Sequence, residues 1–349
     1  MYKVAKREKT KTNKMSGDMK QTTLFDIKGD NLKALMQKER ISLTCAPGGE
    51  NHRGNQLIGR MPVKGEGFTA TDIDEGLGPH FSAIMGEENV EVIDLNANSL
   101  DKIINMLPDE YQARVILLRN WVQSNLGEKK SEEIYGEMYK DHWDAKFLDP
   151  NKDKRDENGD KIIGKDGKPL KGRVLNKHAR RNICYVAGMN QTANYDEGEG
   201  TIVDLKSKAV LYRAIELLKT QIATGLVKID SKTKVEINVV EGNRYYNLKT
   251  TGIGFHGDTE RVVVICITIG GGGDYPMRWQ WFKDGFPVGE SIDVELNDGD
   301  VYIMSEKAVG ADWKKKSMYT LRHAAGAEKY RTLKKWLARM EARKNKNKN

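Results

Sequence analysis

The second half of the chain contains a series of short apolar segments with no helical pattern between them. Asp284-Gly285 and Asp298-Gly299 stand between later segments, and such pairs favour tight turns between antiparallel strands. Consecutive strands without intervening helices predict an antiparallel sandwich or barrel. The expected strands are Val235 to Val240, Arg261 to Ile269, Met277 to Phe282, Ile292 to Leu296 and Val301 to Met304.

Helices are expected around this series. Asp204 is placed to cap a long helix whose apolar residues recur at helical spacing through Ile222. Residues 113–122 are apolar, and periodicity does not distinguish a strand from a helix there. Val90 to Leu95 and Arg180 to Val186 are expected strands. Further helical patterns cover Leu32 to Leu43, Ser99 to Met106, Glu132 to Phe147 (as an exposed amphipathic helix) and Leu333 to Arg343.

The 349 residues suffice for one large domain or two ordinary ones. We expect a disordered basic tail at 1–22 and a region at 23–200 that packs on the core or recognises substrate. The catalytic core is placed at 201–338 and a second basic tail at 339–349. Within the N-terminal region, residues 149–172 are rich in Lys, Asp, Gly and Pro, which predicts a polar surface hairpin.

The net charge of +8 is concentrated at the two ends of the chain. Residues 1–20 carry +5 and residues 327–349 carry +7, so the body is slightly acidic. Basic tails suit attraction to nucleic acid, although solvated termini have the same composition. We expect an intracellular protein, because no apolar run approaches a membrane span and no secretory h-region is present. The three cysteines have no metal-site or disulfide spacing.

A His-x-Asp pair, His256-Gly257-Asp258, leads into one of the expected strands. At a strand end, residues two apart face the same side and can converge on one ion. The other such pair, His142 and Asp144, falls on a helical pattern, where the two side chains point apart. His323 is the candidate third ligand, because the remaining histidines precede the strand series. Two His and one carboxylate form the facial triad that holds iron(II) with open coordination positions.

Two nucleotide-binding patterns fail on their context. Residues 252–257, GIGFHG, match the dinucleotide pattern G-x-G-x-x-G, but a strand follows where a helix is required. Residues 159–165 match most of a phosphate-binding loop, but Asp166 stands where the magnesium ligand should be. We therefore interpret the second pattern as part of the polar hairpin.

Several motifs together resemble the AlkB-like 2-oxoglutarate/iron(II) oxygenases. The resemblance covers roughly the last 150 residues and includes Asn243-Arg244-Tyr245, residues 254–260 (GFHGDTE), residues 299–304 (GDVYIM) and His323. It implies an α+β fold. The core would be a double-stranded β-helix, or jelly roll, with flanking helices and an N-terminal extension.

The resemblance also implies roles for individual residues. His256, Asp258 and His323 would bind iron(II). Asn243 and Tyr245 would contact the co-substrate 2-oxoglutarate, and Glu260 would lie near a target base. Such enzymes use O2 as second co-substrate.

The resemblance further implies that a basic residue from the strand after the distal His pairs with the far carboxylate of 2-oxoglutarate, because a guanidinium fork matches a carboxylate. Arg331 is the first choice, with Arg322 and Lys329 as alternatives. The chain departs from the family pattern in three ways. Residues 308–318 intervene before His323, the usual second arginine is missing, and the spacing from Asn243 to His256 is slightly longer.

The expected function is a dioxygenase that hydroxylates a C–H bond, most specifically the oxidative demethylation of alkylated nucleobases in DNA or RNA. Trp279, Trp281 and Phe282 are candidate stacking residues for such a base, although strand aromatics more often belong to the core. Hydroxylation of a protein side chain or of a 5-methylpyrimidine is the alternative activity. A non-catalytic nucleic-acid-binding protein on an oxygenase scaffold is the alternative from another class.

Overall fold

Two β-sheets lie face to face in the computed structural model of this chain, which describes residues 29–49, 58–63, 65–97, 108, 111–271 and 275–346. The fold is mixed α+β, as expected. The N-terminal tail at 1–22 and the expected helix from Ser99 to Met106 lie outside the described residues.

The larger sheet has eight strands within the described residues and is antiparallel except for its β6–β7 pair. Its strand order is β2 (Val90–Asp94), β3 (Arg114–Leu118), β13 (Val301–Met304), β10 (Val264–Gly270), β1 (Arg40–Ala46), β8 (Val239–Tyr245), β6 (Arg181–Val186) and β7 (Ile202–Asp204). The smaller sheet is antiparallel, in the order β12 (Phe286–Val294), β11 (Met277–Lys283), β14 (Thr320–Gly326) and β9 (Gly252–His256).

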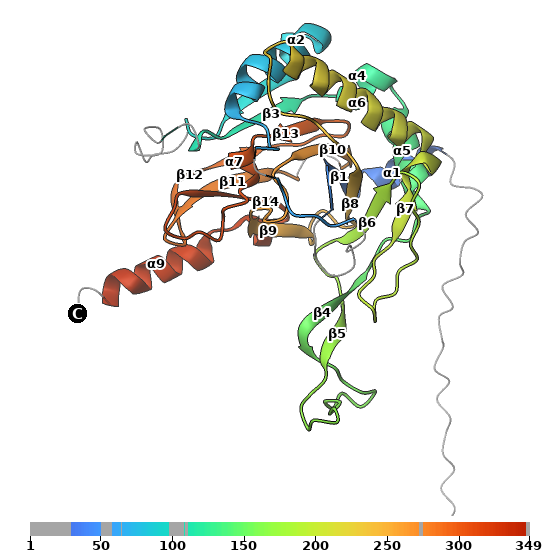
Figure 1. Cartoon of the computed structure of the whole chain (residues 1–349), viewed down its shortest axis with the longest axis vertical. Helices are drawn as coiled ribbons and strands as arrows, with labels where there is room; N and C mark the ends of the chain where they lie inside the picture. Colours follow the sequence, from blue (N-terminus) through green and yellow to red (C-terminus); the bar gives the residue numbers. More distant parts are fainter. Residues whose placement is uncertain are drawn as a thin grey trace, which may run out of the picture.

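Helices cover the outer face of the eight-stranded sheet (Figure 1). Side chains alternate between the two faces of a strand, so Ile41, Leu43 and Cys45 of β1 point toward the helices and are fully buried. They share one core with Leu211 and Leu218 of the longest helix. The covering helices are α2 (Gly78–Met85), α4 (Trp121–Leu126), α5 (Lys130–Tyr139) and α6 (Ala209–Val227).

The four-stranded sheet packs on part of the opposite face. Leu117, Cys266 and Tyr302 from the larger sheet form one buried cluster with Trp279 and Trp281 from β11. Both tryptophans are 1% exposed and Phe282 is fully buried, so the proposed stacking role of these three aromatics is wrong. Each large buried side chain of this kind contributes about 2 kcal/mol to folding.

Strands from both halves of the chain build the larger sheet. β1 lies between β8 and β10, while β3 pairs with β13. The helix expected from Leu32 to Leu43 is only half right. Helix α1 (Gly29–Met36) ends at Met36, and the strand β1 begins at Arg40. β1 has hydrogen-bonded partners on both sides, and these long-range pairings override the local helical spacing.

Other expectations in the N-terminal half have mixed outcomes. The strands near residues 90 and 181 and the long helix after Asp204 are confirmed. The ambiguous segment at 113–122 is the strand β3 followed by the start of α4. The amphipathic helix expected at 132–147 is shorter, and Ile134, Tyr135 and Met138 bury it against the core rather than leaving it exposed.

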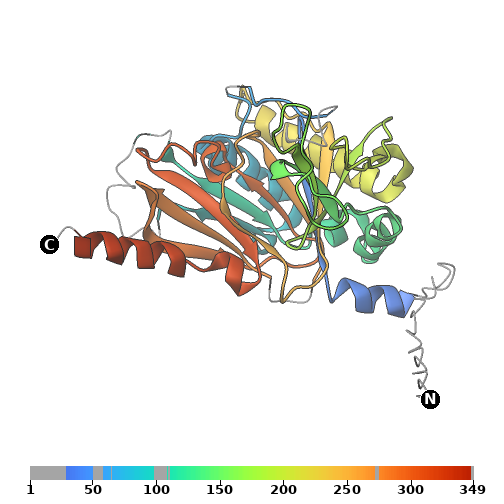
Figure 2. The ribbon, with the colours of Figure 1, turned by 90° about the horizontal axis from the view of Figure 1, so that it is seen from below.

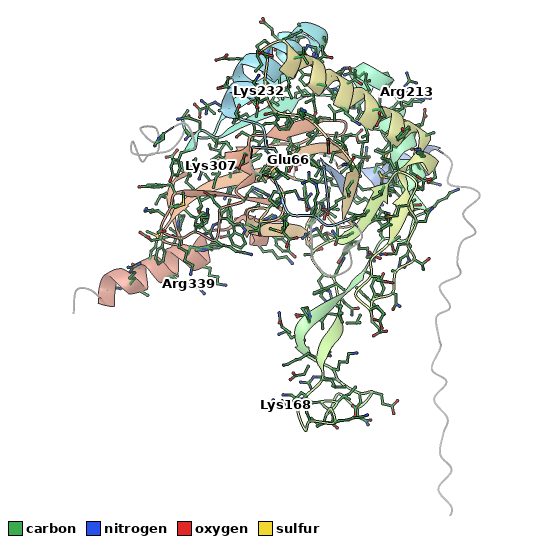
Figure 3. The ribbon with its side chains drawn as sticks, viewed as in Figure 1. Glu66, Lys168, Arg213, Lys232, Lys307 and Arg339 are labelled. Carbon is green, nitrogen blue, oxygen red and sulfur yellow. The ribbon has the colours of Figure 1, made fainter. Side chains whose placement is uncertain are left out.

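Two elements project from the sheets. The hairpin of β4 (Lys146–Asp153) and β5 (Lys171–Asn176) forms a sheet of its own and extends away from the body, with Lys168 near its far end (Figure 3). Helix α9 (Lys334–Lys346) and α1 lie at opposite ends of the molecule (Figure 2). Trp336 of α9 packs edge-on against Phe255 and Phe282, and its ring centroid lies 5.7 Å from the centroid of each. Among the described residues, no helix combines the length and apolar character needed to cross a membrane.

Candidate metal centre

Two histidines face each other across neighbouring strands of the four-stranded sheet. His256 ends β9 and pairs directly with His323 of β14, with ring centroids 4.5 Å apart. Asp258 follows two residues later, and its Oδ1 lies 3.5 Å from His256 Nε2 and 4.0 Å from His323 Nε2. One ligand atom from each side chain lies within 4.8 Å of the others. The structure thus brings together the three residues expected as metal ligands, here called the triad.

Backbone contacts orient the His256 ring. Its Nδ1 lies 2.8 Å from the carbonyl oxygen of Gly254 and 3.1 Å from that of His323. A ring nitrogen beside carbonyl oxygens carries the proton, which leaves a lone pair on Nε2. That lone pair is available to a metal on the side where Asp258 lies.

The turn between His256 and Asp258 is held by the segment that separates β13 from β14. Helix α7 (Glu306–Val309) begins this segment, and the carbonyl of Val309 accepts a hydrogen bond of 3.2 Å from the amide of Asp258. Gly257 packs against Gly310 so closely that a Cβ at Gly257 would lie 2.7 Å from the carbonyl carbon of Gly310. Residues 308–318, which depart from the AlkB-like pattern, therefore support the metal-site turn.

A buried arginine lies beside the triad. Arg261 is 4% exposed, ion-pairs with Glu241, and has its Nε 3.6 Å from Asp258 Oδ2. A guanidinium in this place fixes the direction of the second carboxylate oxygen of Asp258. The first oxygen is the one nearest the two histidines.

The triad lines a cavity of about 860 Å³ between the two sheets. The opposite wall is polar because the inward positions of β1 and β8 are polar. On β1 the residues that alternate with the core positions are Arg40, Ser42 and Thr44. On β8 the inward residues are Glu241, Asn243 and Tyr245. Strand pairing places Asn243 beside Ser42, and Tyr245 beside Arg40.

Three further sequence-predicted residues line this cavity, namely Asn243, Tyr245 and Glu260. Asn243 Oδ1 accepts hydrogen bonds from Arg180 Nε (2.7 Å) and Asn182 Nδ2 (2.6 Å). Burial raises the pKa of Tyr245 to about 12, so its hydroxyl stays protonated at neutral pH. The Glu260 Oε2 atom is buried and has no hydrogen-bond partner among the residues that the structure describes.

The basic residues expected to bind the far carboxylate of 2-oxoglutarate lie elsewhere. Arg331 is on α8 (Glu328–Arg331), donates to the carbonyl of Gly326, and lies 3.9 Å from Asp293 and 3.8 Å from Glu328. Arg322 alternates with His323 and packs over Phe282, 4.0 Å from the ring centroid. The described residues that line the cavity do not include either arginine, or Lys329.

A different arginine, Arg40, lines the cavity. It is 1% exposed, its Nη1 donates to the carbonyl of Leu296, and its Nε and Nη2 have no hydrogen-bond partner within the described part of the chain. Burial lowers the pKa of Arg40, while Tyr275, Asp298 and Asp300 act in the opposite direction, and a guanidinium stays charged at neutral pH. Sequence reasoning missed Arg40 because its segment was read as helical. Reading residues 40–46 at a period of two gives the signal, since polar positions 40, 42 and 44 alternate with apolar ones.

The second His-x-Asp pair is structural. Asp144 is 4% exposed and accepts hydrogen bonds from the Tyr195 hydroxyl (2.9 Å) and from the Thr201 amide (2.9 Å) and hydroxyl (2.7 Å). His142 is exposed and contacts the Tyr195 hydroxyl at 3.0 Å. These contacts satisfy Asp144 without a metal.

Comparison with known proteins finds no family model that matches the chain. It does find a relative, "Uncharacterized protein R156" of Acanthamoeba polyphaga mimivirus, which is 34% identical over 303 residues. The matched region covers 84% of this chain and 98% of that protein. The chain therefore belongs to the same protein family as R156 of the mimivirus.

Proposed function

We propose that this protein is an iron(II)- and 2-oxoglutarate-dependent dioxygenase of the AlkB-like type. The observation that carries the proposal is the convergence of His256, Asp258 and His323 within 4.8 Å at the wall of a large cavity. Two imidazoles and one carboxylate on one side of a site leave coordination positions for co-substrate and oxygen. The donor set and the open cavity beside it both fit iron(II).

The order of the strands supports a double-stranded β-helix. From β8 to β14, successive strands belong to the larger sheet, the smaller, the larger, the smaller twice, the larger and the smaller again. A chain that passes repeatedly between two facing antiparallel sheets follows the jelly-roll pattern. The triad lies on β9, β14 and the turn after β9, so a metal bound by it would lie inside this double layer.

The chain's own residues have separable roles in this proposal. The triad would hold iron(II), and Arg261 orients the Asp258 carboxylate. Asn243 and Tyr245 supply hydrogen-bonding groups on the facing wall. Iron(II), 2-oxoglutarate and O2, when bound, would insert one oxygen atom into a substrate C–H bond and form succinate and CO2. On an N-methyl group the product would be an N-hydroxymethyl group, which breaks down to the N–H group and formaldehyde.

An alkylated base in single-stranded DNA or RNA is the substrate class we propose. Lys146, Phe147 and Lys177, at the base of the β4–β5 hairpin, line the cavity. Residues 146–177 contain ten Lys or Arg against six Asp or Glu, so the hairpin presents positive charge beside the site. A nucleic-acid strand held by such charge can place an unstacked base in a cavity of about 860 Å³. Glu260, on the cavity wall, is positioned to accept a hydrogen bond from that base.

The test is succinate production from 2-oxoglutarate with iron(II), ascorbate and air, with and without methylated single-stranded DNA or RNA. His256→Ala should abolish turnover, and His142→Ala is the matched control because that histidine is exposed in the other His-x-Asp pair. Turnover that needs His256 and rises with methylated nucleic acid supports the whole proposal. Turnover that needs His256 but does not rise with nucleic acid would favour a protein side chain as the substrate. Absence of both turnover and bound iron in the wild type would refute the enzyme.

A further inference from the structure

We infer that Arg40, on a strand from the N-terminal part of the chain, anchors the far carboxylate of the co-substrate. This inference rests on the proposed function. It assigns the preference of the enzyme for 2-oxoglutarate to one residue. The assignment starts from an unusual feature, a guanidinium that is 1% exposed and yet has two nitrogens without hydrogen-bond partners among the described residues.

The position of β1 explains why this arginine is available. After β14 the described chain continues into α8 and α9, so no strand from that part of the described chain follows His323 into the larger sheet. The place between β8 and β10 is taken by β1 instead. Pairing sets Arg40 directly beside Tyr245 on one side and Gly270 on the other, at the end of the strand that lines the cavity.

The chemistry of the site points to an anionic ligand. A buried guanidinium with unsatisfied donors is costly, and a planar carboxylate matches such donors in pairs. Elsewhere in the cavity, Arg180 Nε donates to Asn243, Arg261 pairs with Glu241 and Asp258, and Lys177 donates to Asn182. Arg40 differs in that two of its guanidinium nitrogens, Nε and Nη2, are buried without a hydrogen-bond partner among the described residues.

The Arg40 guanidinium also lies close to the sheet that carries the triad. It is 5.6 Å from the ring centroid of Tyr275, whose hydroxyl lies against Gly326. Gly326 belongs to β14, the strand that carries His323. A ligand bound at the triad therefore has Arg40 on the facing wall of the same cavity.

The test compares two ligands that differ only at the far end. 2-Oxoglutarate carries a carboxylate there, and 5-methyl-2-oxohexanoate carries an uncharged isopropyl group of similar size. Binding of each is titrated by calorimetry on the full chain loaded with cobalt(II), which avoids turnover. The wild type should bind the carboxylate at least about 100-fold more tightly than the isopropyl analogue, a ratio typical for loss of a buried charged partner. Arg40→Met should bring that ratio near one, and Arg40→Lys should restore about tenfold.

Two controls separate this role from others. Cobalt(II) affinity should be unchanged in Arg40→Met, because the triad is intact, and thermal denaturation checks that each variant is folded. Arg331→Met should keep the wild-type ratio, because Arg331 lies outside the cavity lining. An Arg40→Met variant that still prefers the carboxylate, or an Arg331→Met variant that loses the preference, would overturn the assignment. If the wild type binds cobalt(II) but neither ligand, the proposed co-substrate fails together with Arg40. If Arg40→Met alone keeps the preference, only Arg40 fails.

Discussion

Replacing Gly257 by alanine should damage the metal site without changing any ligand. Gly257 lies between His256 and Asp258, and its α-carbon faces Gly310 of the supporting segment. A Cβ at Gly257 would lie 2.7 Å from the carbonyl carbon of Gly310 and nearer still to its oxygen, whereas ordinary contact begins at 3.4 Å. The two backbones must therefore separate by at least roughly 0.7 Å, since backbone atoms cannot rotate away as a side chain can.

The size of this shift decides the outcome. Metal–ligand distances tolerate deviations of only about 0.2 Å, so a shift several times larger in the turn that carries Asp258 should weaken metal binding at least tenfold. A tenfold loss corresponds to about 1.4 kcal/mol. Crowding in a packed backbone should also lower the free energy of unfolding by about 1–3 kcal/mol.

Gly254→Ala supplies the matched control. It makes the same chemical change three residues earlier, but a Cβ there would lie 3.9 Å from its nearest neighbour, the carbonyl oxygen of Tyr330. Cobalt(II) titration and urea denaturation of the apo-protein should show Gly254→Ala within about 0.5 kcal/mol of the wild type. A Gly257→Ala variant with wild-type cobalt(II) affinity would refute the argument that the Gly310 contact sets the triad.

Three other perturbations have defined outcomes. Burial lowers the pKa of Lys177 from 10.5 to about 8, so between those values the unfolded chain binds more protons than the folded one. Wild-type stability should therefore rise relative to Lys177→Met as pH increases from 8 to 10.5, and parallel urea-denaturation profiles would contradict this. Asp144→Ala should lower the free energy of unfolding by about 3 kcal/mol, because it leaves the buried Thr201 amide without its acceptor. His142→Ala, the control, should lower it by less than about 0.5 kcal/mol. Equal losses in urea denaturation would exclude a structural role for Asp144. Replacing residues 154–170 of the hairpin by an Asn-Gly turn should change unfolding free energy by less than about 1 kcal/mol, because the hairpin forms its own sheet, and a larger loss by calorimetry would show that it supports the body.

Local patterns predict the elements whose identity depends on their own residues. The strands beginning at Met277 and Val301 start where expected, because β-branched and aromatic residues there follow turns or loops. The proximity of His256 and Asp258 also follows locally, since residues two apart at a strand end share a face. The pairing of His256 with His323 requires β9 and β14 to be neighbours, which the antiparallel expectation allows but does not specify.

The missed features depend on partners far away in the sequence. Residues 32–43 show apolar spacing compatible with a helix, and only pairing with β8 and β10 makes the later part a strand. Arg331 follows the distal histidine in sequence, as the family pattern requires, yet the chain turns there into short helices. Arg40 reaches the cavity from more than 200 residues away, so no local motif links it to the triad.

The insertion of β1 between β8 and β10 also sets a problem for folding during synthesis. Arg40 pairs with Tyr245 and Gly270, so the strand leaves the ribosome about 200 residues before either neighbour exists. At 5–20 residues per second this delay is roughly 10–40 s. For that time an apolar strand with Ile41, Leu43 and Cys45 has unpaired backbone groups and no core to cover it, which favours chaperone binding or aggregation. The larger sheet is complete only when β13 has been made, because β13 joins β3 to β10. Its folding should therefore be slow and dominated by contacts between distant parts of the chain.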